Sequence, residues 1–195
     1  MMLSVDKVEF AYRSDPVIDD ISFSVDQHDV LTILGPNGVG KTTLLKCLNR
    51  MLIPRGGNVM VEGTDARSLS RRDLARYMGY VSQRGDVTRM TVYDLILLGR
   101  RPHFDWSAGK EDHKLTAQVI ELMELSPLAV RYADELSGGE LQMVQIARAL
   151  VQEPRIIILD EPTNSLDIRN QHRVLSTIKN IIESHPMAEI GRAHV

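Results

Sequence analysis

The chain has 195 residues, of which 43% are hydrophobic and 25% charged, and its formal net charge is −3. This composition is typical of one ordinary globular domain, and the slight acidity argues against a nucleic-acid partner. The single cysteine, Cys47, excludes an internal disulfide, and no apolar stretch approaches the roughly 20 residues needed to cross a bilayer. If the protein works at a membrane, we expect other chains to supply the span.

The N-terminal third predicts strands followed by a helix. Residues 3–10 and 21–25 alternate apolar and polar side chains, which is the pattern of half-buried strands. The continuous apolar run at 30–34 predicts a buried strand that ends at a glycine. A helix is predicted from Lys41, and Pro54 ends it. The apolar face of that helix is predicted to comprise Leu44, Leu45, Leu48, Met51 and Leu52.

The rest of the chain alternates again between strands and helices. A strand is predicted at 58–62, and a mostly helical stretch at 65–130. A helix at 139–152 precedes a fully apolar strand at 156–159, and a last helix spans about 168–184. The last helix is expected to bury Val174, Leu175, Ile178, Ile181 and Ile182. These elements predict the α/β fold class.

A glycine-rich segment between the strand at 30–34 and the following helix matches the phosphate-loop pattern G-x-x-x-x-G-K-[ST]. Glycines let backbone N–H groups surround phosphate oxygens, and the helix N-terminus adds its dipole. Lys41 is expected to reach the β- and γ-phosphates of ATP, and the Thr42 hydroxyl to bind Mg²⁺. A structural glycine turn would not explain Lys and Thr at this spacing. The predicted nucleotide-binding residues are Gly35, Pro36, Asn37, Gly38, Val39, Gly40, Lys41, Thr42 and Thr43.

Two acidic residues, Asp160 and Glu161, end the apolar strand at 156–159. Ligands of parallel α/β sheets bind at that end of the strands. We predict that Asp160 holds Mg²⁺ through water and that Glu161 polarises the attacking water as general base. Taken alone, the pair could be the charged end of a strand at solvent. Beside a phosphate loop, the catalytic interpretation is favoured.

The segment Leu136–Gln142 has the sequence LSGGELQ and precedes a predicted helix. Ser137 can cap this helix, and Glu140 completes a capping box, so a purely structural helix start is one interpretation. Two glycines beside a capping serine also make an anion-binding helix N-terminus. LSGGE, with the phosphate loop before it and ILDEPT after it, closely resembles the ATP-binding cassette (ABC) ATPases over nearly the whole chain.

This resemblance implies a P-loop NTPase core in a single domain 1–188, with an N-terminal antiparallel β subdomain and a helical subdomain inserted at about 88–152. It implies that Tyr12 stacks on adenine and that Gln83 is a catalytic residue touching Mg²⁺ and the attacking water. It also implies a homodimer that buries two ATPs. The residues expected to reach the ATP of the partner subunit are Leu136, Ser137, Gly138, Gly139, Glu140 and Asp167.

Residues 91–103 and 164–172 resemble the importer ATPases for ferric siderophores, haem and cobalamin. Such an ATPase would lie on the cytoplasmic face of the membrane, bound to a separate permease. A solute-binding protein would supply the solute to that permease. Arg100 and Arg101 could instead be the solvated end of a packing helix. The alternatives are an ABC ATPase for another small solute, a soluble ABC protein acting on ribosomes or DNA, and a non-enzymatic dimerising module. The intact Glu161 argues against the last.

The last seven residues, 189–195, depart from the family pattern. A strand buried on both faces is near-continuously apolar, and Glu189, Gly191 and Arg192 interrupt it. One reading frame of a common sequencing-library adapter encodes the same seven residues. We therefore expect a non-native tail after Ala188, one or more missing strands, and a chance match of His194 to the family's γ-phosphate histidine. Such a chain is expected to be poorly stable and slow in hydrolysis.

Overall fold

The computed structural model describes residues 1–83, 89–163, 166–184 and 187–192. Its strands are β1 (Leu3–Tyr12), β2 (Asp15–Val25), β3 (Val30–Ile33), β4 (Gly56–Val61), β5 (Thr64–Asp65), β6 (Met78–Val81), β7 (Ile156–Asp160) and β8 (Ala188–Arg192). Its helices are α1 (Lys41–Leu48), α2 (Arg71–Tyr77), α3 (Val92–Leu97), η1 (Leu98–His103), α4 (Lys110–Leu122), η2 (Ser126–Leu128), η3 (Ala133–Glu135), α5 (Gly138–Leu150) and α6 (Ile168–Ser184). Helices and strands alternate along the chain, which confirms the α/β class.

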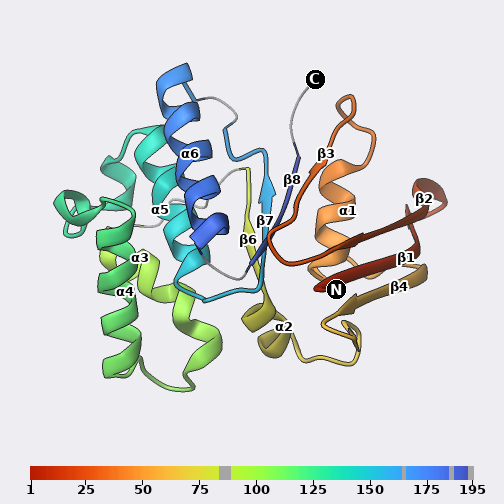
Figure 1. Ribbon diagram of the computed structural model, residues 1–195, viewed down its shortest axis with the longest axis horizontal. Coiled ribbons are helices and arrows are strands. Elements are labelled where there is room, and N and C mark those ends of the chain that lie inside the picture. The colour runs from red at the N-terminus through yellow and green to blue at the C-terminus, as the bar shows by residue number, and fades with distance from the viewer. Residues whose placement is uncertain (84–88, 164–165, 185–186, 193–195) are drawn as a thin grey trace.

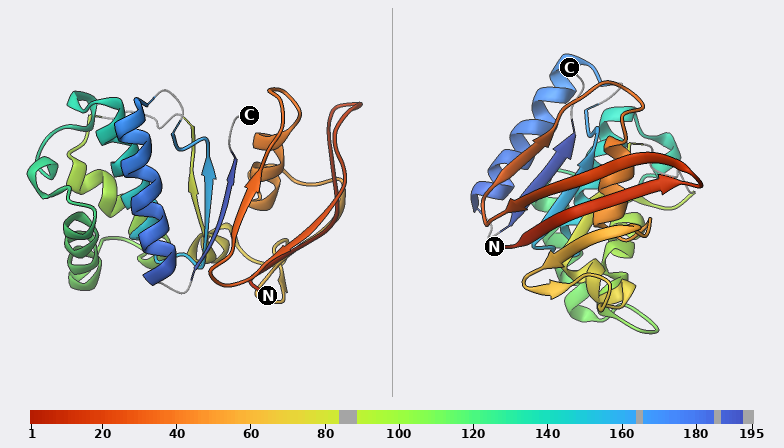
Figure 2. Two further views of the ribbon diagram at one scale, coloured as in Figure 1. Left: turned by 45° about the horizontal axis from the view of Figure 1, so that its top comes forward. Right: turned by 90° about the vertical axis from the view of Figure 1, so that its right-hand side faces the viewer.

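The strands form two sheets with α1 packed between them, as Figure 1 and Figure 2 show. The antiparallel sheet has the order β2-β1-β4-β5, and the parallel sheet has the order β3-β8-β7-β6. The helices α3, α4, α5 and α6 lie on the other side of the parallel sheet. Strand β7 is therefore covered on both faces and flanked by strands on both edges.

The strand predictions hold for most of the chain. Strands β1 and β2 pair antiparallel and are longer than the alternating segments predicted. All of β7 is buried, as expected. The prediction of a buried strand at 30–34 is wrong in part, because Val30 is 58% exposed and Leu34 is 60% exposed. The reason is that β3 lies at an edge of the described parallel sheet, where its outer side has no neighbouring strand.

Two helical predictions need correction. Helix α1 ends at Leu48 and the chain turns at Arg50, which has a φ of +52°, so Met51 is 53% exposed instead of extending the apolar face. In α6, Leu175 is 52% exposed, whereas the other predicted core residues of that helix are buried. The stretch 65–130 is also not uniformly helical. It contains β6, which pairs with β7 in the parallel sheet.

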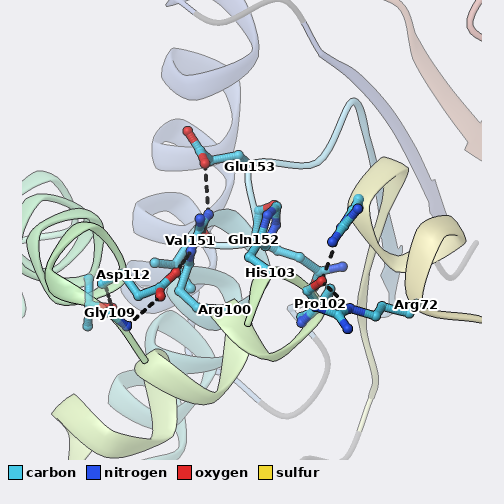
Figure 3. Close-up of polar contacts among 11 residues, drawn as sticks. Arg72, Arg100, Pro102, His103, Gly109, Asp112, Val151, Gln152 and Glu153 are labelled. Carbon is cyan, nitrogen blue, oxygen red and sulfur yellow. Dashed lines mark hydrogen bonds and ion pairs between the residues drawn. The ribbon is translucent and has the colours of Figure 1, made fainter. Parts of the chain in front are cut away.

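A buried arginine ties η1 to the helices around it, as Figure 3 shows. Arg100 donates to the Asp112 carboxylate at 2.9 Å, to the Val151 carbonyl at 2.9 Å and to the Glu153 carboxylate at 2.7 Å. Its side chain is only 6% exposed. The interpretation of Arg100 as part of a solvated helix end is therefore wrong. This arginine instead fixes η1 against α4 and the end of α5.

The prediction that the charged residues interrupt a buried strand after Ala188 is wrong for the described residues up to Arg192, whereas the non-native origin of residues 189–195 stays a prediction. Strand β8 lies between β3 and β7 and pairs in parallel with both. Ala188 and Ile190 are buried in the core beside α1, so backbone pairing and small or apolar side chains outweigh the charged positions. His194 lies outside the described residues.

Glu189 predicts a loss of stability as the pH rises. Burial raises the pKa of its carboxyl from 4.5 to about 7, so the folded chain favours the neutral acid. Since the folded pKa lies above the unfolded value, this stabilisation is complete below about pH 4.5 and is lost through about pH 7. The loss is expected to be on the order of 2 kcal/mol.

Denaturant unfolding at pH 5 and pH 8 measures this effect. Glu189→Gln keeps the shape of the side chain and removes the titrating group, so it should reduce the difference between the two pH values. An unchanged difference in the variant would contradict the assignment to Glu189.

Candidate active site

The loop between β3 and α1 has a backbone that glycine favours. Gly38 has a φ of +80° and Gly40 a φ of +104°, both in the left-handed region. A Cβ on Gly40 would also lie 2.9 Å from the carbonyl oxygen of Val17 on β2. These two glycines therefore let the loop turn tightly against the antiparallel sheet before α1 begins.

Lys41, the first residue of α1, extends back into this loop. Its side chain is buried, at 4% exposure, and its ammonium donates to the carbonyls of Gly35 at 2.5 Å and Pro36 at 2.8 Å. The loop thus holds one positive charge at its centre, next to the N-terminus of a helix. This is an arrangement that suits a polyphosphate.

Asp160 lies at the end of β7 and is contacted by two hydroxyl groups. Thr42 donates to its Oδ1 at 3.3 Å, and Tyr80 on β6 donates to its Oδ2 at 2.9 Å. Burial raises the pKa of Tyr80, and the Asp160 carboxylate raises it further, so the phenol stays protonated and able to donate. One carboxylate oxygen is thereby held by Tyr80, while the other faces Thr42.

Tyr80 is a contact that sequence reasoning missed. The signal was present, because Tyr80 pairs with Ile158 in a neighbouring parallel strand. Ile158 and Asp160 are two residues apart on β7 and so share a face. The pairing of β6 with β7 therefore places Tyr80 beside Asp160.

The structure brings the predicted catalytic residues Glu161 and Gln83 together. Glu161 is buried, at 5% exposure, and accepts a hydrogen bond at 2.6 Å from the Gln83 side-chain amide. Its φ of +55° is uncommon for a residue other than glycine. Backbone strain of this kind occurs where surrounding structure fixes a side chain, and it is frequent at functional sites.

Arg192 at the end of β8 compensates the charge of this acidic pair. Its guanidinium forms ion pairs with Asp160 and, at 3.2 Å, with Glu161. Its side chain is 10% exposed, so the pairing is largely shielded from water. Two adjacent buried carboxylates repel each other and need a cation. Sequence reasoning treated Arg192 only as a disruption of the strand and missed this role.

The oxygens gathered here fit Mg²⁺. Thr42 Oγ1, Asp160 Oδ1 and the Gln83 amide supply the hard oxygen ligands that Mg²⁺ prefers, and the Arg192 guanidinium shows that the site accepts positive charge. Within the described ranges, no group of three or more His, Cys, Asp or Glu side chains could hold a metal alone. Mg²⁺ would therefore need water and substrate phosphates as additional ligands, which is its usual mode of binding.

The LSGGE segment forms the predicted capping box at the start of α5. The Ser137 hydroxyl accepts from the Glu140 backbone N–H at 3.3 Å, and the Glu140 carboxylate accepts from the Ser137 N–H at 2.8 Å. The Ser137 hydroxyl also donates to the Glu140 carboxylate at 2.6 Å, and this bond together with the one from the Ser137 N–H lowers the pKa of Glu140. A Cβ on Gly139 would lie 2.7 Å from the Asn170 side chain, so this segment packs against α6.

The remaining predicted residues lie apart from the phosphate loop. Asp167 accepts from the Asn170 backbone N–H at 2.8 Å and thereby caps α6. Tyr12 at the end of β1 is 48% exposed and meets Phe10 edge to face, with 4.9 Å between ring centres. Among the contacts of the described residues, none joins Ser137 or Asp167 to the loop at 35–43.

Comparison with known proteins assigns the family. The model of the ABC transporter family matches residues 18–164, a span that includes the phosphate loop and the Asp160–Glu161 pair. The chain is an ABC transporter ATPase subunit. ATP hydrolysis coupled to transport is the general activity of this family. No helix in the described part of the ABC ATPase is long and apolar enough to cross a membrane.

Curated relatives of this ABC ATPase include archaeal proteins. An uncharacterised ABC transporter ATP-binding protein of Methanocaldococcus jannaschii is 49% identical over 100% of this chain and 76% of its own length. A phosphonates import ATP-binding protein of Haloarcula marismortui is 35% identical, covering 99% of this chain and 75% of its own. A cobalamin import ATP-binding protein of Halobacterium salinarum is 32% identical over 100% of this chain and 49% of its own.

Solved structures confirm the P-loop fold of this ABC ATPase. A nucleotide-free ATP-binding cassette from an ABC transporter has a TM-score of 0.90 and 25% identity, covering 99% of this chain and 81% of its own. An inward-facing ABC transporter assigned to the metal-chelate type has a TM-score of 0.85 and 31% identity, covering 98% of this chain and 72% of its own.

Tyr80→Phe tests whether the phenol hydroxyl positions Asp160. The variant keeps the ring but leaves Asp160 Oδ2 without its donor, so the carboxylate can turn away from Thr42. The Mg²⁺ concentration for half-maximal MgATP binding should rise about tenfold, the size expected for a hydrogen bond to a charged group. A Mg²⁺ titration with a fluorescent ATP analogue measures this.

Tyr77→Phe, on the adjacent helix α2, is the matched control and should behave as the parent chain. Thermal melting in EDTA checks that all three proteins fold; Tyr80→Phe should melt at a somewhat lower temperature, because a buried carboxylate oxygen loses its donor. An equal Mg²⁺ shift in both variants, or none in Tyr80→Phe, would show that Tyr80 does not position Asp160.

Proposed function

We propose that this ABC ATPase binds Mg-ATP on the loop at 35–43 and hydrolyses it as a homodimer to drive import of a ferric siderophore, haem or cobalamin. The observation that carries the catalytic part is the buried pair Asp160 and Glu161, which Thr42 and Gln83 contact from two other segments. In this pair, Asp160 would bind the metal ion and Glu161 would activate the attacking water molecule. Their neighbour Lys41 supplies charge for phosphate.

Lys41 binds the β- and γ-phosphates in this proposal. Its ammonium already lies inside the loop, bonded to two carbonyls, so phosphate oxygens can replace those carbonyls without a large movement of the side chain. Backbone N–H groups of the loop and of the α1 N-terminus complete the phosphate site. When bound, Mg²⁺ neutralises charge on the phosphates. Thr42, Gln83 and Asp160 would hold that ion.

Glu161 acts as general base in this proposal. Gln83 donates to Glu161 Oε2 at 2.6 Å, and the Arg192 guanidinium lies 3.2 Å from Oε1, so the attacking water would take the place of Arg192 at Oε1 and give its proton there. The bond to Gln83 fixes the direction of the carboxylate, and burial limits its solvation. Gln83 thereby positions both Glu161 and the water that attacks the γ-phosphate.

A second copy of the chain completes each site in this proposal. The helix N-terminus at Ser137–Gly139 suits an anion, yet no described contact joins it to the phosphate loop of its own chain. A partner's γ-phosphate would bind there, next to Leu136, Glu140 and Asp167. Tyr12 presents a half-exposed ring on which adenine can stack.

A pocket of about 680 Å³ connects this centre to η1. It is lined by Gln83 and Asp160 at the catalytic centre and by Leu98, Arg101 and Pro102 of η1. We assign this pocket to the permease, because a segment docked there would contact both η1 and Gln83. The ATPase would then lie on the cytoplasmic face of the membrane, and a solute-binding protein would deliver the solute to the permease from the other side.

Two solute classes compete. The resemblance of residues 91–103 to siderophore, haem and cobalamin importers, the cobalamin import relative and the metal-chelate type transporter support a metal chelate. Phosphonate is the second candidate, because the phosphonates import relative is 35% identical and matches 75% of its own length. The ATPase does not contact the solute, so transport itself has to decide.

Uptake by proteoliposomes that contain the chain and the permease encoded beside it separates these classes. Cobalamin or a ferric siderophore, each with its binding protein, should stimulate ATP hydrolysis and enter the vesicles. Glu161→Gln should bind ATP normally and abolish both activities. Stimulation by phosphonate alone would overturn the metal-chelate assignment but keep the ATPase. Full hydrolysis by Glu161→Gln would overturn the assignment of Glu161 as general base.

A further inference from the structure

The loop that follows η1 presents the chain's only tryptophan to solvent. Trp106 is 98% exposed. The loop lies next to α2, whose first two residues are Arg71 and Arg72, and η1 contributes Arg101. We call these three arginines, with Phe104 and Trp106, the Arg–Trp patch.

Hydrogen bonds hold this loop in place. Arg72 and Arg76 of α2 donate to the Pro102 carbonyl at 2.8 and 3.0 Å; Figure 3 shows Arg72 reaching Pro102. Arg72 also forms an ion pair with Asp105, and Arg101 donates to the Asp105 carbonyl at 2.8 Å. The exposed Trp106 therefore directly follows a segment, residues 102–105, that is anchored to α2 and to Arg101.

The patch carries a pocket and an excess of positive charge. A pocket of about 340 Å³ is lined by Arg71, Arg72, Arg101, Pro102, Phe104 and Asp105. Asp105 is the only acid in this lining and offsets one of its three arginines. Arg71 makes no hydrogen bond or ion pair with the described residues. A positive pocket therefore lies on a chain whose net charge is −3.

We propose that the Arg–Trp patch binds the headgroups of anionic membrane lipids. Tryptophan is enriched where a bilayer meets water, and arginine binds phosphate with paired hydrogen bonds. A protein partner would instead require a packed apolar centre, whereas the apolar part here is one protruding ring and the half-buried edge of Phe104. A cation-rich pocket with one interfacial ring suits a lipid surface better.

The orientation needed for this contact rests on the proposed docking of a permease. Arg101 and Pro102 line both the patch and the pocket assigned to the permease. A permease seated on that pocket would therefore bring the patch toward the bilayer that surrounds it. Contact with lipid would then help to hold the ATPase subunit on the membrane when ATP opens and closes the dimer.

Tryptophan fluorescence tests this proposal without a label, because Trp106 is the only emitter of its kind. The purified chain is titrated with phosphatidylglycerol vesicles and with phosphatidylcholine vesicles. Its emission should move to shorter wavelength with the anionic vesicles only. The shift should disappear in about 0.5 M NaCl, which screens surface charge.

Arg71→Gln is the deciding variant, since Arg71 has no hydrogen bond or ion pair within the described chain to lose. It should raise the lipid concentration for half-maximal shift about fivefold, the effect expected for one basic residue at an anionic surface. Arg169→Gln, an equal loss of charge on α6, should leave that concentration unchanged. No shift with anionic vesicles, or equal weakening in both variants, would overturn the proposal.

Nucleotide binding provides an independent readout. MgATP should raise the thermal midpoint of Arg71→Gln as much as that of the parent chain. Absence of a vesicle response in a parent chain that still responds to MgATP would reject the lipid site alone. Loss of the nucleotide response in the parent chain would instead reject the proposed ATPase function.

Discussion

Two adjacent carboxylates, Asp160 and Glu161, are buried at the end of β7 and need a positive charge beside them. This constraint explains much of the site around them. Strand β7 must be flanked and covered to bury the pair, and its neighbours supply the groups that orient it. Tyr80 comes from β6, Thr42 from α1, and Arg192 from β8. In an ATPase the natural cation at such a pair is Mg²⁺ carried with the nucleotide. Arg192 provides a fixed charge in the same place.

Nucleotide binding needs residues of one chain only, whereas the proposed complete catalytic site needs a second copy of the chain. The phosphate loop, Lys41 and the acidic pair meet within one chain, so nucleotide binding is local to it. The helix N-terminus at Ser137 faces α6 in its own chain. In the proposed dimer the two phosphate-binding elements would serve different nucleotides. Within one chain, the hydrogen bonds of Arg100 fix η1 against α4 and the end of α5.

The parts of the fold and site that depend on local patterns could be predicted from the sequence. The loop glycines, the Ser137–Glu140 capping box and the fully buried β7 follow from neighbouring residues, and each was predicted. The sequence-based predictions were wrong where contacts between distant segments of the chain determine the structure. Val30 is exposed because β3 lies at a described sheet edge, and Met51 because the chain turns after α1. Tyr80 reaches Asp160 only through strand pairing. Arg192 breaks the apolar pattern of a central strand, yet Asp160 and Glu161 compensate its charge.

The central claim is that the Arg192 guanidinium lies where the nucleotide-bound metal has to act. Comparing Arg192→Ala with the parent chain, with Arg155→Ala as a surface control, tests it most directly. The measurement is the Mg²⁺ concentration that gives half-maximal MgATP binding. The account predicts that this concentration falls about tenfold in Arg192→Ala, because a competing charge-assisted contact is removed, while ATP binding in EDTA does not improve. An unchanged or higher Mg²⁺ requirement in Arg192→Ala would contradict it.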